Sequence, residues 1–77
     1  MIVRVKLFGE LRDAKPAPEG THVVDVPVSC SVREVLDYMR IDPAKPKIIL
    51  ANGAHVELDH ELRDGDVLSI FPPVGGG

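Results

Sequence analysis

Cysteine is almost missing from this sequence, and so are several patterns that would define a class of function. The single cysteine, Cys30, excludes an intramolecular disulfide and any metal site built from cysteines. Small secreted domains are normally cross-linked, and the N-terminus enters a strand with no leader pattern, so we expect a reduced, cytoplasmic protein. No apolar stretch approaches the ~18 residues of a membrane span, which excludes a membrane-spanning segment.

An excess of positive charge is also missing. Nine Lys and Arg stand against twelve Asp and Glu, for a formal net charge of −3, and the basic residues are scattered among acids. A nucleic-acid binder needs a basic stripe for phosphate contacts, so neither nucleic acid nor a membrane is expected as a partner. At 77 residues, 44% of them hydrophobic, the chain is one small folded domain and not a disordered segment.

Motifs for catalysis or metal binding are lacking as well. The histidines His22, His55 and His60 show no metal-ligand spacing beyond a loose His55–His60 pair, so we interpret them as surface residues. Cys30 has no cationic neighbour in sequence, which favours a buried or inert thiol. No nucleophile elbow, phosphate-binding loop or dinucleotide fingerprint occurs, so any chemistry is expected at the end of the chain.

What is present is a strong pattern of strands with one helix. Residues 2–8 alternate as a half-buried strand, residues 9–21 are interpreted as a loop, and residues 23–26 complete a hairpin. Ser31 to Glu34 fits a capping box, and apolar residues at helical spacing follow up to Met39, before Asp42-Pro43 stops the only predicted helix.

The second half of the chain predicts three more strands. The apolar run 48–51 indicates a central strand buried on both faces or nearly so, Asn52-Gly53 a hairpin turn to a short strand at 55–57, and residues 67–71 the last strand. The order ββαβββ predicts a two-layer α+β domain, one helix on a mixed sheet. If the two long strands lie side by side as parallel neighbours, the helix is their right-handed crossover. The predicted core is Val3, Val5, Leu7, Val24, Val26, Val32, Val35, Leu36, Met39, Ile48, Leu50, Leu62, Leu68 and Ile70.

Glycine and proline are concentrated at the C-terminus. Of seven Gly and seven Pro, five lie in the last six residues, Pro72-Pro73-Val74-Gly75-Gly76-Gly77. Two prolines keep the chain extended, and glycines add no side chains, so the six residues could carry the terminal carboxylate roughly 20 Å from the sheet. Such a narrow segment suits entry into a channel of another protein.

This tail and the order of elements together resemble the ubiquitin-like β-grasp sulfur carriers of the MoaD and ThiS group. Within it the sequence is most similar to the MoaD family, the small subunit of molybdopterin synthase. The similarity rests on Asp64-Gly65-Asp66-Val67, on Phe71-Pro72-Pro73-Val74 with Gly76-Gly77, and on the segments 5–12, 31–34 and 51–53. It implies a β-grasp domain over 1–71 and an extended tail over 72–77.

The resemblance also implies a function and its partners. Gly77 would be adenylated by an E1-like (MoeB-like) enzyme that uses ATP, would be converted to a thiocarboxylate with sulfur from a donor protein, and would pass sulfur to a pterin precursor in a large MoaE-like subunit. Gly75 and Gly76, with Pro72, Pro73 and Val74, would form the stalk. The chain would hold no permanent cofactor and no metal, and would not be an enzyme by itself.

Strand parity adds a candidate partner surface. Phe8 alternates with Arg4 and Lys6, and Phe71 with Ser69, so both phenylalanines are expected on the outer face of the sheet. Family members dock partners through an apolar patch there. The third position of that patch is often aliphatic in the family and is His55 in this sequence. Gly75 stands at a tail position where family members commonly have a residue with a small side chain.

Other functions stay open at this point. They are a sulfur carrier for thiamin thiazole or tRNA thiolation, a ubiquitin-like modifier joined through Gly77 to lysines, and a binding module to which the tail is incidental. The Phe-Pro-Pro-Val run argues against a thiazole carrier.

Overall fold

The alternation at the N-terminus produces the first strand of a computed structural model that describes residues 1–73. In β1 (Ile2–Leu7), Val3, Val5 and Leu7 are buried and the residues between them face outward. β1 pairs antiparallel with β2 (Thr21–Asp25), with Val3 opposite Val24. The predicted hairpin is therefore confirmed.

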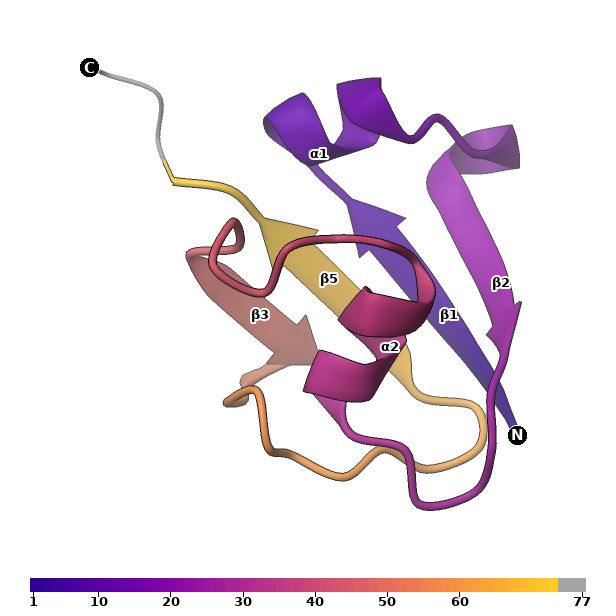
Figure 1. Cartoon of the computed structure of the whole chain (residues 1–77). Coiled ribbons are helices and arrows are strands. Elements are labelled where there is room, and N and C mark those ends of the chain that lie inside the picture. The colour runs from indigo at the N-terminus through magenta and orange to yellow at the C-terminus, as the bar shows by residue number, and fades with distance from the viewer. Residues whose placement is uncertain (74–77) are drawn as a thin grey trace.

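The connection within this hairpin is not the plain loop that the sequence predicts. Residues Gly9–Ala14 form a short helix, α1, and Pro18–Gly20 form a 3₁₀ turn, η1. The interpretation of residues 9–21 as a loop is therefore wrong, and so is the prediction of a single helix. Leu11 packs against the core and stabilises α1, which is too short to show a helical pattern of apolar residues in the sequence. Figure 1 shows α1 at the end of the sheet from which the C-terminal segment also leaves.

The main helix, α2 (Val32–Tyr38), begins as its capping box predicts. The Ser31 hydroxyl accepts a hydrogen bond from the Glu34 amide, and the Glu34 carboxylate accepts one from the Ser31 amide, both at 3.2 Å. The helix ends at Tyr38, with Met39 as its C-cap, so it stops before Asp42-Pro43 and not at that pair. Arg40 there adopts a left-handed conformation (φ 60°) that ends the helix locally.

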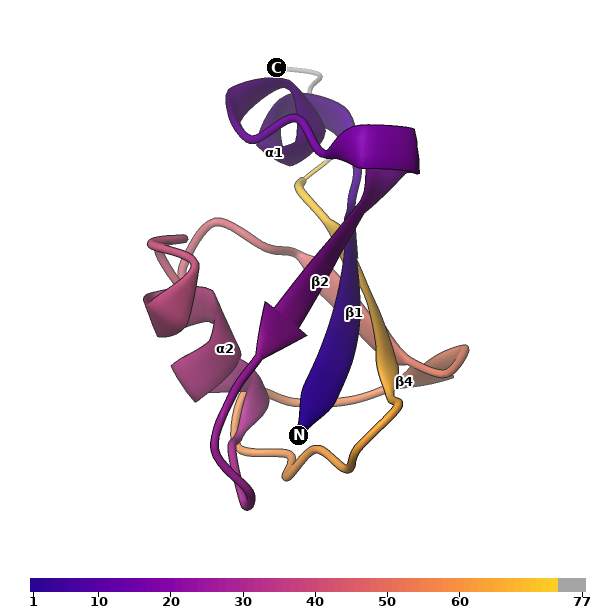
Figure 2. The ribbon, with the colours of Figure 1, turned by 90° about the vertical axis from the view of Figure 1, so that its right-hand side faces the viewer.

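The sheet is mixed and has the order β2-β1-β5-β3-β4. β5 (Val67–Phe71) lies between β1, to which it is parallel, and β3 (Ile48–Ala51), to which it is antiparallel. β4 (Ala54–His55) follows a turn in which Asn52 and Gly53 both have positive φ, and it is shorter than the strand predicted at 55–57. Figures 1 and 2 show α2 on one face of this sheet, which confirms a two-layer α+β fold.

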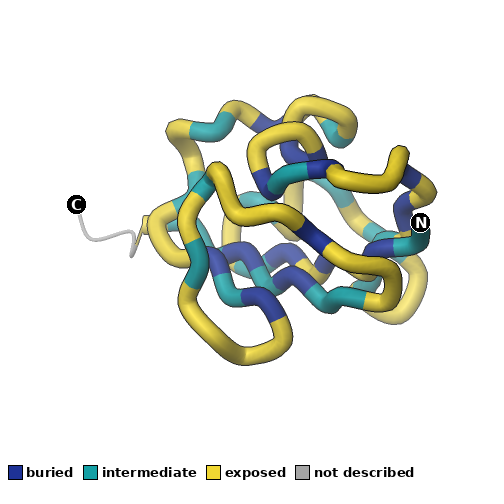
Figure 3. The backbone as a smooth tube through the Cα atoms, turned by 90° about the horizontal axis from the view of Figure 1, so that it is seen from below, coloured by how far each residue is buried: buried dark blue, intermediate teal, exposed yellow. Residues whose placement is uncertain are grey.

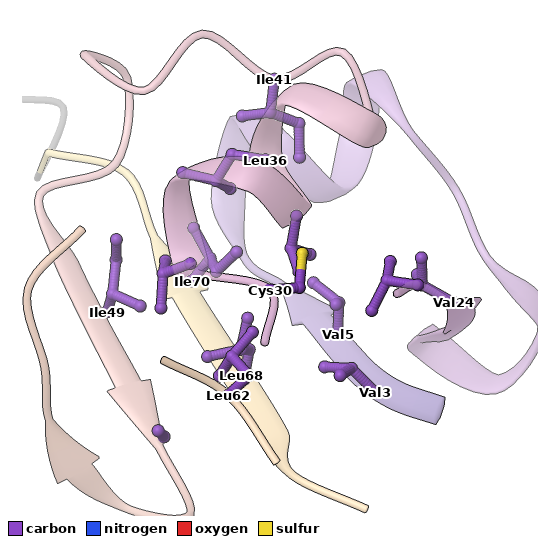
Figure 4. Packing of buried hydrophobic residues seen from close by; sticks show 14 of the residues in the cluster. Val3, Val5, Val24, Cys30, Leu36, Ile41, Ile49, Leu62, Leu68 and Ile70 are labelled. Atoms are coloured by element: carbon purple, nitrogen blue, oxygen red, sulfur yellow. The ribbon is translucent and has the colours of Figure 1, made fainter. Parts of the chain in front are cut away.

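The core lies between α2 and the inner face of the sheet. Figure 4 shows buried side chains of α2 meeting those of β1, β3 and β5, and in Figure 3 exposed loops surround this interior. Its fully buried members are Val3, Val5, Val32, Val35, Leu36, Leu68 and Ile70. Cys30 and Ile41, which were not predicted as core residues, are buried as well, whereas Met39 is only partly buried.

The sequence predicted Ile48 and Leu50 of β3 as core residues, but the other two residues of the strand face the core. Ile49 and Ala51 are buried, whereas Ile48 is 42% exposed and Leu50 is half-buried on the outer face. The strand is thus not buried on both faces. The antiparallel register with β5 decides which residues turn inward, since it pairs Ile49 with the buried Ile70 and Ala51 with the buried Leu68. Within residues 1–73, no helix combines the length and the apolar character that crossing a membrane requires.

Candidate partner face and tail exit

The C-terminal segment leaves the sheet from one of its inner strands. β5 ends at Phe71, whose carbonyl accepts a hydrogen bond from the Lys47 amide at 2.8 Å, and Pro72 and Pro73 follow. Because proline has no amide hydrogen and fixes φ, the pair cannot continue the pairing of β5. The other predicted tail residues, Val74, Gly75, Gly76 and Gly77, lie outside the described residues.

The two phenylalanines of the chain meet at this exit. Their rings stack with centroids 4.3 Å apart and planes 9° from parallel. The parallel register brings them together, because Leu7 pairs with Ile70 and the Phe8 amide donates to the Ile70 carbonyl at 3.1 Å. Both side chains are half-buried on the outer face, as strand parity predicts, and each ring shields one face of the other.

Gly9 makes room for the first residue of the tail. A Cβ atom at Gly9 would lie 2.9 Å from Cγ of Pro72, and Gly9 has φ +58°, a conformation that disfavours any side chain. The segment Phe8-Gly9, between β1 and α1, therefore contacts both Phe71 and Pro72. It fixes the direction in which the chain leaves the domain.

Two aliphatic residues that were assigned to the core extend the apolar surface around the stack. Ile48 pairs with Phe71, and Leu50 pairs with both Ser69 and His55, so these side chains share the outer face. Phe8, Ile48, Leu50 and Phe71 are called the outer-face patch below. His55 lies at its margin, exposed on β4, the strand next to that of Leu50, and it is not in the stack.

The outer face next to this patch is basic. Arg4 and Lys6 of β1 are exposed there, beside Val67 and Ser69 of β5. Among the described strand residues with outward parity, Asp25 at the far end of β2 is the only carboxylate, although the chain has a net charge of −3. The acidic residues are concentrated on the helices and loops, which leaves an apolar and basic face.

The Asp64-Gly65-Asp66-Val67 segment has a structural role in this molecule. The Asp64 carboxylate accepts a hydrogen bond from the Ile2 amide at 2.6 Å. The Asp66 carboxylate accepts from the Arg63 amide and the Asn52 side-chain amide, while the Asn52 carbonyl oxygen accepts from the Val67 amide. Burial opposes ionisation of Asp66, but these hydrogen bonds and the nearby His60 and Arg63 lower its pKa. The segment anchors the start of β5, the strand that carries the tail.

The other side chains considered for chemistry are accounted for by packing. Cys30 is buried, which agrees with the expectation of a buried or inert thiol, and its burial, together with the smaller effect of the nearby Glu34 charge, raises the pKa of that thiol. The His22 ring forms a hydrogen bond with the Lys15 carbonyl at 2.9 Å, while His60 is exposed. Residues 1–73 contain no group of three or more side chains arranged to hold a metal ion.

Sequence reasoning placed Phe8 and Phe71 correctly on one face but missed Ile48, Leu50 and Gly9. The apolar run 48–51 has no polar residue that would reveal its parity. For Gly9 a signal was available, since a glycine directly after a strand often marks a positive φ, but its contact with Pro72 depends on the tertiary fold.

A mixed five-stranded sheet that holds one main helix, with an extended segment leaving an inner strand, defines a β-grasp protein of the ubiquitin-like type. The ThiS family model matches residues 5–77, and the chain belongs to that family. It thus has the fold shared by ThiS/MoaD-like sulfur carriers, generally non-catalytic proteins, and ubiquitin-like modifiers.

Solved structures of both kinds are similar to this chain. SAMP1 from Haloferax volcanii has 28% identity and a TM-score of 0.79, with 100% of each chain covered. A Pyrococcus furiosus protein, provisionally assigned as molybdopterin converting factor subunit 1, has 27% identity and a TM-score of 0.78 over 96% of this chain and 99% of that one. A complex of subunits 1 and 2 of molybdopterin-converting factor from Helicobacter pylori matches with 26% identity and a TM-score of 0.63, covering 100% of both chains. Among curated proteins, none matches.

Proposed function

We propose that this protein is a cytoplasmic sulfur carrier for molybdopterin biosynthesis, with Gly77 as the residue that carries sulfur. One observation carries the proposal: the chain leaves β5 at Phe71-Pro72, directly beside the outer-face patch. A partner that covers this patch is within reach of the terminal carboxylate, since six extended residues span roughly 20 Å.

The chemistry needs an activated terminus, because a carboxylate is a poor acyl donor. A Gly77 carboxylate oxygen would attack the α-phosphate of ATP in an E1-like, MoeB-like enzyme, releasing pyrophosphate and leaving an acyl adenylate. Attack by a sulfur nucleophile on the acyl carbon would expel AMP and give the thiocarboxylate. The thiocarboxylate sulfur would then attack a carbon of a pterin precursor in a MoaE-like large subunit and displace a leaving group from it. Hydrolysis of the resulting acyl–sulfur bond by water would leave the sulfur on the precursor and return the Gly77 carboxylate. The catalytic groups would belong to the partners, and ATP would be a substrate of the E1-like enzyme.

The outer face supplies the means of docking. The outer-face patch offers two stacked aromatic rings and two aliphatic side chains, the kind of surface that forms the centre of protein interfaces. Arg4 and Lys6 beside it favour partners with carboxylates at the matching positions. The similar Helicobacter pylori protein is described in a complex of subunits 1 and 2, which supports a large-subunit partner for this chain as well.

The test is to incubate the protein with a MoeB-like enzyme, ATP and hydrosulfide, and to weigh the intact chain by mass spectrometry. We expect the mass to rise by the difference between one sulfur and one oxygen atom. A chain lacking Gly77 should stay unmodified while its circular dichroism is unchanged. No mass change in the full-length chain, with the enzyme active on a known carrier, would exclude the sulfur-carrier function.

Docking is tested separately with Phe71→Arg. This charge should weaken binding to a MoaE-like subunit by about tenfold or more, because it places a cation in the centre of the patch. The control is Val28→Arg, which changes a side chain 79% exposed in the loop after β2. Equal effects of both variants on affinity would show that the patch is not the docking site.

A second candidate function is protein modification, in which Gly77 is joined to lysines of other proteins. The similarity to SAMP1, whose name in a second structure is small archaeal modifier protein 1, favours it. Lysine conjugates of this chain, formed in place of a thiocarboxylate in the assay above, would select this function.

A further inference from the structure

β2 is an edge strand whose outward backbone groups have no strand beside them. The described sheet has the order β2-β1-β5-β3-β4, so β2 pairs only with β1. Met1 and Val26 exchange two hydrogen bonds, at 2.7 and 2.9 Å. Because such pairs alternate along an antiparallel ladder, Val24 and His22 direct their backbone groups to β1, whereas Thr21, Val23 and Asp25 direct theirs outward.

The free edge carries a symmetric set of groups. Val23, at its centre, offers an amide and a carbonyl, Asp25 offers an amide, and Thr21 offers a carbonyl, since the Thr21 amide already donates to Pro18. The Val23 side chain is 64% exposed although it is apolar. A groove of ≈ 510 Å³ runs along this edge towards Tyr38 of α2, which is also 64% exposed.

We propose that β2 pairs with β2 of a second copy of this chain, antiparallel and centred on Val23. Val23 of each copy would donate to and accept from Val23 of the other, and each Asp25 amide would donate to the Thr21 carbonyl of the other copy. This register uses every outward group except the Asp25 carbonyl. It also places the two exposed valines in contact on the outer face.

The charges of the edge fit this register. The Asp25 carboxylate, whose side chain is 81% exposed, already lies 3.6 Å from the Met1 ammonium of its own chain. In the dimer it would also lie next to the Thr21 hydroxyl of the other copy, which can donate to it. Lys6 of β1 is paired with Thr21 of the same chain. In the dimer, the Asp25 side chain of one copy, the Thr21 side chain of the other copy and the Lys6 side chain of that other copy would therefore lie in one row across three strands. A parallel pairing of the two β2 edges would instead require one copy to be turned over, so the two Val23 side chains would lie on opposite faces of the sheet and could not meet.

The dimer would form one continuous sheet with both α2 helices on the same face, because the two-fold axis of an antiparallel pair is perpendicular to the sheet. Both grooves would then join over the two β2 strands. Only the β2 edge is used, so the outer-face patch and the end of β5, two strands away, stay accessible to partners. The inference is independent of the proposed function.

The test is to measure self-association of the pure protein over a range of concentrations by sedimentation velocity, and to monitor amide hydrogen exchange by NMR at the same concentrations. We expect dimers to appear between about 10 μM and 1 mM, as suits an interface well below ~1,200 Å². The Val23 and Asp25 amides should exchange rapidly in dilute protein and become protected as concentration rises. A protein that stays monomeric throughout, or dimers without this protection, would overturn the proposal.

Two variants locate the contact. Val23→Pro removes the central donor without removing a bond to β1, and edge strands tolerate proline, so the monomer should fold and the dimer should be lost. Ile48→Lys, on the outer-face patch, should leave the dimer intact. The opposite pattern would mean that the outer face associates and the β2 edge does not. If Val23→Pro does not fold, the protection pattern in the unmodified chain decides alone.

Discussion

The stacked pair Phe8 and Phe71 should couple the end of β1 to the exit of the tail, and a double-mutant cycle measures that coupling. We would replace each phenylalanine by leucine, singly and together, so that apolar volume stays while the ring contact is lost. With centroids 4.3 Å apart and planes 9° from parallel, the rings are in stacking contact over their faces. Aromatic pairs contribute about 0.5–1.5 kcal/mol beyond the area that they bury.

We expect the free energy of unfolding to show a coupling of about 1 kcal/mol between the two sites, towards the middle of that range, because both rings are only half-buried. For a domain of this size the urea dependence of the unfolding free energy is about 1 kcal/mol per M. The single variants should therefore each shift the urea midpoint by about 1 M or more, and the double variant should shift it by less than their sum.

The assay is urea denaturation followed by circular dichroism, since the chain has no tryptophan. Equal slopes for all four proteins are required before the midpoints are compared. If the two changes add within about 0.3 kcal/mol, the rings do not stabilise one another and the stack does not hold β5 against β1. Leu7→Ala would be a poor control because that side chain is buried, so Lys6→Ala, exposed on the same strand, is preferred.

Three further changes test the surroundings of β5. Gly9→Ala should lower the unfolding free energy by about 1–2 kcal/mol in urea denaturation, through its positive φ and the contact with Pro72, and an unchanged midpoint would contradict that geometry. Asn52→Ala should lower the unfolding free energy by about 1–2 kcal/mol, and Asn52→Gly should lower it less, because glycine adopts the left-handed turn without strain. Equal losses for the two variants would mean that Asn52 contributes through its hydrogen bonds and not through the turn conformation. The lowered pKa of Asp66 means that its contribution is present above the unfolded pKa of about 4 and is lost as pH falls through the folded value. The urea midpoint of Asp66→Asn should therefore lie below that of the unmodified chain at neutral pH, and the two should converge in acid.

Local signals in the sequence were enough for most of the fold. Alternation in residues 2–7 set which side of β1 is buried, the capping box set the start of α2, and Asn52-Gly53 set the turn to β4. Each of these signals acts between residues a few positions apart, so no tertiary contact was needed to interpret it. Strand parity placed Phe8 and Phe71 on the outer face, but their stack depends on the parallel pairing of β1 with β5, which no local signal specifies.

The failures have a common physical cause. α1 has six residues and no fully buried side chain, and it depends on contacts of Leu11 with a core formed by other segments. The inward side of β3 is chosen by β5, which lies about twenty positions further along the chain. A local pattern cannot carry information that only a distant strand supplies, so both features were predicted wrongly.

The two features that were predicted wrongly, α1 and the inward side of β3, both lie near the point where the tail leaves the domain. On β3, the residues that face outward can be replaced more easily than those that face the core. Ile48 lies beside Phe71 on a half-exposed face, so replacing it by a polar residue removes little buried area and should cost little stability. Its counterpart Ile49 on the same strand is 6% exposed against the core, where the same replacement would leave a polar group without water. Under the proposed function, binding and folding would therefore depend on alternate residues of β3. If the outer-face patch is the docking site, partner choice would change through Ile48 and Leu50, while Ile49 and Ala51 of the same strand keep their packing beside Ile70 and Leu68.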